Sequence, residues 1–283
     1  MAPVVGPHSA FEDFLRVEAT GDGAWSSALA DFDWGAAFGG DLLARMALAA
    51  SRDVGPERAL RSLHAHFLAP ATPGSAAALH VTPLGDDAHE TRRRVAVTAG
   101  GAALCEGVAS FAATAAGPRY HAGGFDASLA APESLPSDVE LAQSDGWPVR
   151  YLAPIEFRRA EPRAWPFPAA ADGEASHWSG WLRPRVPLSA DPALHAAALV
   201  FASDYRSHWG PETRLGPAFG AHAYTSLDHA LWIHAPQAWT DWWLFETRSE
   251  ICRDGRALTQ RTVWTRDGLR VATIAQEGLL RPR

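Results

Sequence analysis

Apolar residues recur along this chain with helical spacing in two segments. Residues 38–50 carry apolar side chains every three or four positions, and polar positions are almost absent from the segment. This spacing predicts a helix that is apolar on nearly all sides and therefore buried. Residues 192–205 show the same character and predict a second buried helix. The apolar positions of the first helix are Leu42, Leu43, Met46, Ala49 and Ala50.

Shorter apolar stretches, separated by glycine- and proline-containing turns, predict antiparallel strands around each helix. Two short strands, residues 14–18 and one near Trp25, are expected before the first helix, and four longer ones after it. Gly100-Gly101 between the last two is a strong hairpin signal. The four strands that follow the first helix are expected at residues 60–68, 76–83, 89–99 and 102–113.

The pattern then repeats, which predicts an α+β chain of two similar halves. We expect an N-terminal unit at residues 1–116, a linker rich in Pro, Ala, Ser and Asp at 117–147 with a short helix near 139–142, and a C-terminal unit at 148–283, irregular over 162–173. The expected strands of the second half are residues 151–159, 177–184, 221–234, 242–251, 257–266 and 269–280.

The two halves also align through their polar residues. Asp41 lies 21 residues before Ser62, and Asp204 lies 22 residues before Ser226. We therefore expect Asp41 to be the counterpart of Asp204 in the first half.

Composition excludes several classes of function. The net charge is −7, all 25 basic residues are arginines, and only Arg92-Arg93-Arg94 forms a tight basic cluster, which argues against a nucleic-acid partner. No apolar run approaches the roughly 20 residues of a membrane span. Without a recognisable secretory signal, and with Cys105 and Cys252 as the only cysteines, the chain is expected to be cytoplasmic with reduced thiols.

Three polar residues stand out among the apolar segments of the second half: Asp204, Ser226 and Gln276. A carboxylate, a hydroxyl and a carboxamide suffice to hold and activate one water molecule. Gln276 is the most informative of them, because an amide within the strand at 269–280 fits a core only when it has hydrogen-bond partners.

Several short motifs together resemble the acyl-CoA thioesterase II family, over nearly the whole chain. The resemblance rests on Phe38-Gly39-Gly40, on the segment from Ser62 to Pro70, on Ser226-Leu227-Asp228-His229 with Trp232 and His234, and on Gln276-Glu277-Gly278. It departs from the family at Asp41, where the family often has glutamine.

The resemblance implies a double hotdog fold, in which each half wraps an antiparallel sheet around a central helix. It also implies hydrolysis of acyl-CoA or a related thioester by water that Asp204 activates, with Ser226 and Gln276 orienting that water. No metal or redox cofactor is expected, and the chain is expected to form a dimer or higher homo-oligomer through its sheet edges. Asp41 is a second candidate carboxylate, with a helix N-terminal charge as the alternative interpretation.

Other polar residues are interpreted as structural. Asp228 and His229 are adjacent on a strand and point to opposite faces, so they do not line one pocket together. Asp228 is expected to bind backbone at the sheet junction, and His229 or His234 to lie at a subunit contact. His64 and His66 share a face but lack a third metal ligand. Cys105 is not expected to act as a nucleophile.

Two rival functions remain open at the sequence level. An enoyl-thioester hydratase on the same fold requires an Asp–His pair, which Asp204 and His208 match weakly, since the Asn-Pro-x-His pattern is absent. A non-catalytic thioester-binding protein is the other rival. It is disfavoured if Asp204, Ser226 and Gln276 converge on one site.

Overall fold

A computed structural model describes residues 5–6, 8–32, 35–144, 154–160, 168 and 176–283. In the first half, a short helix α1 (Phe11–Phe14) precedes the strands β1 and β2, and the buried helix α2 (Gly39–Ser51) precedes four longer strands. The strands of this half are β1 (Glu18–Gly21), β2 (Ala24–Ala28), β3 (Arg58–Phe67), β4 (Ala76–Asp86), β5 (Glu90–Ala99) and β6 (Ala102–Ala113).

The second half repeats this order after a connection that carries η1 (Pro132–Ser134) and α3 (Asp138–Ser144). The helix α4 (Pro192–Asp204) takes the place of α2. It is followed by α5 (Trp209–Leu215) and η3 (Gly216–Ala221). The strands are β7 (Ile155–Arg159), β8 (Ser176–Pro184), β9 (His222–Ser226), β10 (Asp228–Ile233), β11 (Trp243–Arg253), β12 (Arg256–Thr265) and β13 (Arg270–Pro282).

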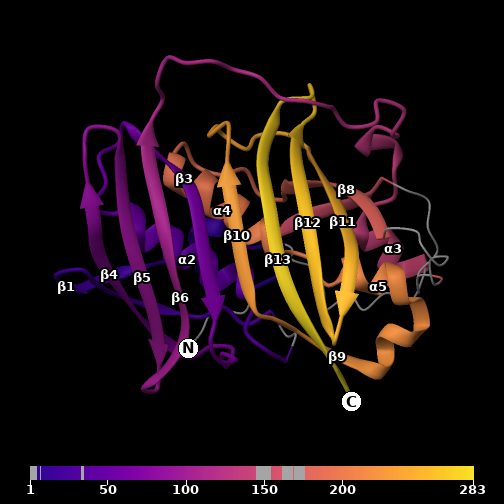
Figure 1. Cartoon of the computed structure of the whole chain (residues 1–283), viewed down its shortest axis with the longest axis horizontal. Coiled ribbons are helices and arrows are strands. Elements are labelled where there is room, and N and C mark those ends of the chain that lie inside the picture. Colours follow the sequence, from indigo (N-terminus) through magenta and orange to yellow (C-terminus); the bar gives the residue numbers. More distant parts are fainter. Residues whose placement is uncertain (1–4, 7, 33–34, 145–153, 161–167, 169–175) are drawn as a thin grey trace.

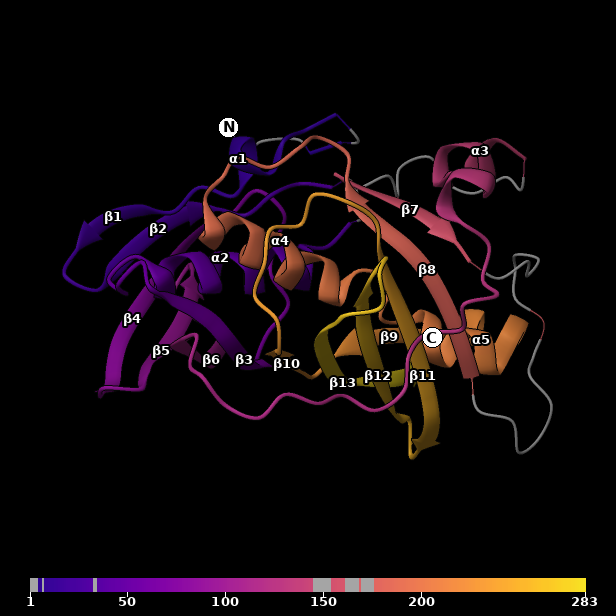
Figure 2. The same cartoon turned by 90° about the horizontal axis from the view of Figure 1, so that it is seen from above.

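All thirteen described strands belong to one antiparallel sheet, in the order β1-β2-β4-β5-β6-β3-β10-β13-β12-β11-β8-β7, with β9 paired to β13. The halves join where β3 pairs with β10, in a register that sets His64 opposite Ala230. Figure 1 shows this seam in the middle of the sheet. The sheet curves around α2 and α4, which lie on its inner face (Figure 2). This is the double hotdog arrangement that the sequence resemblance implies.

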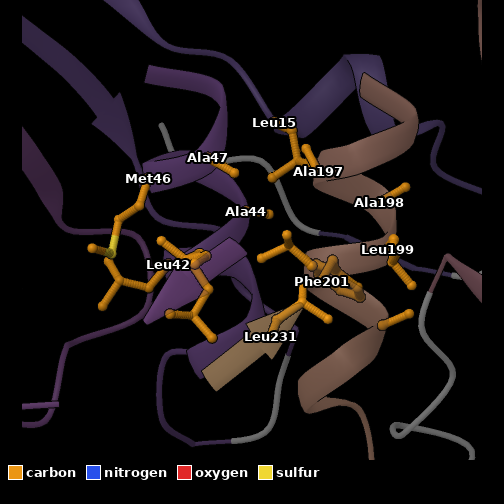
Figure 3. Close-up of a cluster of buried hydrophobic side chains, with 14 of the residues drawn as sticks. Leu15, Leu42, Ala44, Met46, Ala47, Ala197, Ala198, Leu199, Phe201 and Leu231 are labelled. Atoms are coloured by element: carbon orange, nitrogen blue, oxygen red, sulfur yellow. The ribbon is translucent and has the colours of Figure 1, made fainter. Parts of the chain in front are cut away.

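The two helices pack against each other and form the centre of the core. They run in opposite directions, because the first turn of α2 meets the last turn of α4. A side-chain carbon on Gly40 would lie 2.5 Å from the Phe201 carbonyl oxygen, so this approach requires glycine. Ala44 and Ala197 face the helix contact, and Leu42, Phe201 and Leu231 fill the space beside it (Figure 3).

The internal repeat is precise enough to match individual residues. Both helices have 13 residues. In each, the backbone N–H of the first residue after the helix donates to the carbonyl three residues earlier: Arg52 to Ala49 after α2, and Tyr205 to Ala202 after α4. Asp204, the last residue of α4, therefore corresponds to Ser51. The expected pairing of Asp204 with Asp41 is wrong, because Asp41 is the third residue of α2.

The strands give an equally clear match. Leu68 and Ala69 both donate to the Leu104 carbonyl, as His234 and Ala235 both donate to that of Val271. In the first half, the pairing of β3 with β6 shifts register just after the pair Leu60–Phe111. In the second half, the strand that pairs with β13 is interrupted between β9 and β10, just after the pair Ser226–Gly278. The repeat therefore matches Ser226 with Leu60.

Most predicted elements are confirmed within a few residues, including the short helix near 139–142, which is α3. The strand expected at 14–18 is wrong, because Phe14 ends α1 and β1 begins only at Glu18. The strand expected at 221–234 is divided at Leu227 into β9 and β10. The helix α5 was not predicted. The segments expected at 151–153 and, apart from residue 168, at 162–173 lie outside the described residues.

Candidate active site

Asp204 ends α4 with its side chain turned into the protein, and only 5% of the residue is exposed. The helix stops there because Tyr205 is extended and Arg206 takes a positive φ of 58°. The chain thus turns away while the carboxylate points toward β13. Asp204 is therefore not the solvated helix-end residue that its position in the sequence alone would suggest.

Gln276 lies on the inward face of β13, where every second residue from Ala272 to Gly278 is buried. Its Nε2 donates to Asp204 Oδ1 at 2.8 Å and to Ser226 Oγ at 2.7 Å. The three residues singled out in the sequence therefore converge on one carboxamide, although they come from α4, β9 and β13. Among the described residues, the one further oxygen within hydrogen-bonding distance of Nε2 is Ser207 Oγ, at 3.2 Å.

The position of Ser226 follows from the break after β9. Ser226 is partly exposed and pairs with Gly278 across the two strands. A side chain at Gly278 would collide with the ring of Tyr224, so the glycine of the Gln-Glu-Gly motif makes room for that ring. The Tyr224 ring thereby packs beside Ser226 and encloses that side of the site.

Two further members of this cluster were missed by the sequence analysis. Ser207 Oγ donates to Asp204 Oδ1 at 3.2 Å. His229 is buried and its Nδ1 lies 2.8 Å from Gln276 Oε1, while its Nε2 lies 2.8 Å from Ser203 Oγ. Of the two histidines expected at a subunit contact, His229 is therefore ruled out by its burial, and His234 stays a prediction. In β10 the buried positions alternate, at 229, 231 and 233, and this alternation identifies His229 as inward-facing.

His229 fixes the orientation of the Gln276 carboxamide. Burial lowers the pKa of His229 to about 4, so its ring is neutral near pH 7. In the tautomer that carries the proton on Nδ1, the ring donates to Gln276 Oε1, which leaves the amide NH₂ of Gln276 facing Asp204 and Ser226. Asp228, on the opposite face of β10, accepts from the Glu277 N–H at 2.8 Å, which confirms its predicted backbone contact at the junction.

The environment raises the pKa of Asp204 to about 6. Burial is the largest cause, because it disfavours the charged carboxylate. Four neighbours lower the pKa of Asp204 in part: the hydrogen-bonding side chains of Gln276 and Ser207, the positive charge of Arg261 and the Gly40 N–H. The result is a carboxylate that is ionised at neutral pH and still basic enough to accept a proton.

The first half completes the surroundings of this carboxylate. A side-chain carbon at Gly39 would lie 2.8 Å from Asp204 Oδ2 and 3.0 Å from the Phe67 ring. The N-terminus of α2, with its partial positive charge and the Gly40 N–H that bonds to Asp204, therefore faces the site. Glycine at this position allows the helix end and the carboxylate to meet.

Arg261 on β12 holds the end of α4 in place. It is 2% exposed, and its Nη1 donates to the Ser203 carbonyl at 3.0 Å and the Tyr205 carbonyl at 2.7 Å. These carbonyls flank Asp204, so the guanidinium fixes the backbone on both sides of the carboxylate. Burial lowers the pKa of Arg261 to about 10, which leaves the group charged at neutral pH.

Asp41 lies apart from this cluster, in a buried ion pair with Arg45. Its Oδ2 accepts from the Ala30 N–H at 3.0 Å and from Arg45 Nε at 3.1 Å, and Arg45 Nη2 in turn donates to the Phe14 carbonyl at 2.9 Å. Burial raises the pKa of Asp41, while the Arg45 charge opposes that effect. These contacts tie α2 to α1 and to the segment just after β2, and they favour a structural role. A direct role of Asp41 in catalysis stays a prediction.

Other chemistries find little support among the described residues. No group of three or more potential ligands that could hold a metal ion occurs in the described parts of the chain. Burial raises the pKa of Cys105 to about 12, so this thiol is a poor nucleophile. His208, the partner that a hydratase requires, lies against the rings of Phe219 and Tyr224. None of the described helices has the length and apolar character of a membrane span.

Two family models match the chain, one for each half. The model described as the acyl-CoA thioesterase N-terminal domain matches residues 30–114, and that of the acyl-CoA thioesterase C-terminal domain matches residues 132–280. The second match alone covers more than half of the chain.

Individual relatives agree with these matches. The crystal structure of an acyl-CoA thioesterase II, TesB2, from Mycobacterium marinum is similar with a TM-score of 0.80 and 27% identity, over 97% of this chain and 99% of that one. Acyl-CoA thioesterase 2 of Haemophilus influenzae is 25% identical over 94% of this chain and 95% of its own length. Acyl-coenzyme A thioesterase 8 of Mus musculus is 26% identical over 86% of this chain and 80% of its own length.

Proposed function

The chain belongs to the acyl-CoA thioesterase family, and from this premise we propose that it hydrolyses acyl-CoA thioesters at the cluster of Asp204, Ser226 and Gln276. The observation that carries the proposal is the convergence of these three side chains, with the Gln276 carboxamide within 2.8 Å of both partners. Neither rival function requires this convergence. A hydratase would need a histidine on the carboxylate, and none of the described histidines bonds to Asp204. A binding protein does not need a carboxylate of raised pKa.

The reaction is written with water as the nucleophile. The Asp204 carboxylate takes a proton from water as its oxygen forms a bond to the thioester carbonyl carbon. The negative charge moves to the carbonyl oxygen, and the tetrahedral intermediate then expels the sulfur of CoA with its bonding electrons. The protonated Asp204 returns its proton to that sulfur, which yields the free acid, CoA and the regenerated carboxylate.

Each neighbouring group has a stated task in this scheme. Gln276 and Ser226 orient the attacking water, because Ser226 Oγ and the amide lie beside the carboxylate that receives the proton. The N–H groups at the start of α2 stabilise the developing negative charge on the carbonyl oxygen. His229 and Arg261 touch no reacting atom, and they position Gln276 and Asp204.

A thiol-release assay across acyl-CoA substrates of different chain lengths tests this proposal. Asp204→Asn keeps the size and hydrogen-bonding reach of the side chain but cannot accept the proton. We expect its kcat to fall by about a hundredfold or more, in the range that a general base contributes.

Asp228→Asn is the matched control, because it makes the same chemical change at a carboxylate that binds backbone 2.8 Å away. It should keep most of the activity. Equal thiol release by wild type and Asp204→Asn would contradict the assignment of the base. No release by the wild type on any acyl-CoA would contradict the proposed activity itself.

The division of the chain and its surroundings belong to the same proposal. We assign residues 1–116 and 148–283 to the two hotdog units, with 117–147 as the linker, and the protein to the cytoplasm as a homo-oligomer. An exposed aromatic pair on the outer face of the seam supports assembly: Trp232 is 39% exposed and its ring lies 4.7 Å from that of His64. Sedimentation of wild type and Trp232→Ser tests whether this face is a subunit contact.

A further inference from the structure

The internal repeat places a second location in the molecule that corresponds to the catalytic cluster. By the matches given above, Asp204 corresponds to Ser51 and Ser226 to Leu60. The same strand register matches Gln276 with Ala109. The carboxylate and the carboxamide are thus replaced by residues that cannot activate water. This second location lies at the opposite ends of the two helices, where α2 ends and α4 begins.

A cavity of about 510 Å³ opens at this second location. Ser51 and Leu60, the counterparts of Asp204 and Ser226, both line it. Its volume is within the range of roughly 300–1,000 Å³ that small-molecule sites occupy. Its walls are mainly apolar and come from both halves; they include Ala47, Phe111, Ala196, Leu199, Ile233 and Trp243.

The cavity is separate from the catalytic cluster. Asp204 and the cavity lie at opposite ends of α4, and a helix of 13 residues is roughly 20 Å long. Leu43, Phe201 and Leu231 are fully buried in the core between the two ends. Figure 3 shows Phe201 and Leu231 in this packed core, between the facing helices and the sheet.

Positive charge borders the cavity at its rim. Arg52, Arg58 and Asp191 are the charged lining residues. Arg58 already donates to Thr91 Oγ1 and to the Asp87 carbonyl, and Asp191 caps α4 by accepting from the Ala193 N–H. Arg52 is exposed and forms no ion pair with any residue in the described ranges. An apolar cavity with one uncommitted cation at its rim is complementary to a hydrocarbon chain that ends in a carboxylate.

We propose that this cavity is a second, non-catalytic binding site for a straight-chain fatty acid. The chain occupies the apolar space between the end of α2 and the start of α4, and the Arg52 guanidinium pairs with the carboxylate. Binding here does not require the catalytic cluster, so it can be measured independently of the proposed hydrolysis.

Equilibrium dialysis of the whole protein with radiolabelled dodecanoate tests the proposal, with Asp204→Asn as a background that has no turnover. Ala196→Phe fills the cavity from α4, whereas Ala112→Phe places the same ring on a partly exposed residue of β6 that does not line it. We expect Ala196→Phe to lose one bound dodecanoate per chain, and Ala112→Phe to lose none. The same loss in both variants, or in neither, would overturn the proposal.

The rim is tested separately, with surface changes that leave the core intact. Arg52→Gln should weaken dodecanoate binding at this site about tenfold, with little effect on dodecanol, which has no charge. Arg248→Gln, an exposed arginine on β11 outside the cavity, should change neither. Equal weakening of acid and alcohol would overturn the assignment of Arg52 to the carboxylate.

A third measurement distinguishes a separate site from an extension of the catalytic one. With Asp204 restored, Ala196→Phe should release thiol from each acyl-CoA within about twofold of wild type. A change in acyl-chain preference would overturn the proposal, because the cavity would then hold the acyl chain of the substrate. An inactive wild type that still shows the Ala196-dependent dodecanoate site would overturn only the proposed hydrolysis.

Discussion

Gln276 connects all the polar side chains that we assign to catalysis. It donates to Asp204 and Ser226 from one end of the amide, while His229 binds the other end. Such a network constrains each member, because turning the amide would set its oxygen against the carboxylate. The sequence made Gln276 conspicuous because a buried strand amide needs partners, and the family resemblance implied its role in the site. It missed His229 because nothing in the residue itself reveals which inward-facing group it meets.

Burial of Asp204 has a cost in stability that a substitution should reveal. Its folded-state pKa of about 6 lies above the ordinary value of 3.8, so the folded state binds the proton more tightly than the unfolded state. The resulting loss in the free energy of unfolding grows as the pH rises from about 4 to about 6 and is constant above pH 6. Its full size is on the order of 3 kcal/mol, from about 1.4 kcal/mol per pKa unit.

Asp204→Asn removes this penalty. We expect the variant to be more stable than wild type in urea unfolding at pH 7.5, and its advantage to shrink at pH 4.5. An inactive variant with unchanged or lower stability at pH 7.5 would contradict the raised pKa. The expected combination of lost activity and gained stability is typical of a strained catalytic group.

At the scale of elements, the site depends on where helices begin and end. The periodicity predicted both long helices almost to the residue, because each is apolar on all sides and cannot be a surface helix. It did not predict the helix α5, which has only seven residues and contains Gly210 and Pro211. The single strand expected at 221–234 was wrong because the break at Leu227 is set by pairing with β13, which no local pattern records.

Because α2 begins against the end of α4, we expect a single methyl group added at Gly39 to lower activity strongly. In Gly39→Ala the new carbon would lie 2.8 Å from Asp204 Oδ2, so the helix end or the carboxylate must move. A displacement of this size costs catalysis about tenfold to a hundredfold, because the reacting groups lose their alignment. Gly220→Ala, with no atom within 4 Å of the new carbon, is the control for thiol release. Full activity in Gly39→Ala would place the reaction elsewhere.

Arg261 provides a test at the other side of the carboxylate. Its positive charge lowers the pKa of Asp204, so Arg261→Met should raise that pKa. The acid limb of the kcat/KM profile should then move to higher pH by about one unit. Arg253→Met, an exposed arginine on β11, should leave the limb in place. A lower activity with an unmoved limb would indicate that Arg261 acts only on stability.

At the scale of the whole molecule, both halves contribute to the one cluster that we propose as catalytic. The first half supplies the N-terminus of α2, and the second supplies Asp204, Ser226 and Gln276. The order of elements in the sequence predicted the repeat and an α+β chain, and the resemblance to the thioesterase family implied the double hotdog fold. Counting residues matched Asp41 to Asp204, and this match was wrong because a conserved interval does not fix the position within a helix. The cavity at the second location could not be predicted, since it arises from packing between the halves.

The most direct test of the account is the dependence of kcat/KM on pH, measured with an S-acyl-N-acetylcysteamine substrate that carries no titrating phosphate. If Asp204 is the general base, activity falls about tenfold per pH unit below an apparent pKa near 6 and is constant above it, because only the carboxylate accepts the proton. The residual activity of Asp204→Asn should lack this limb. A wild-type profile that is flat through pH 6, or a limb that persists in Asp204→Asn, would contradict Asp204 as the group that activates water.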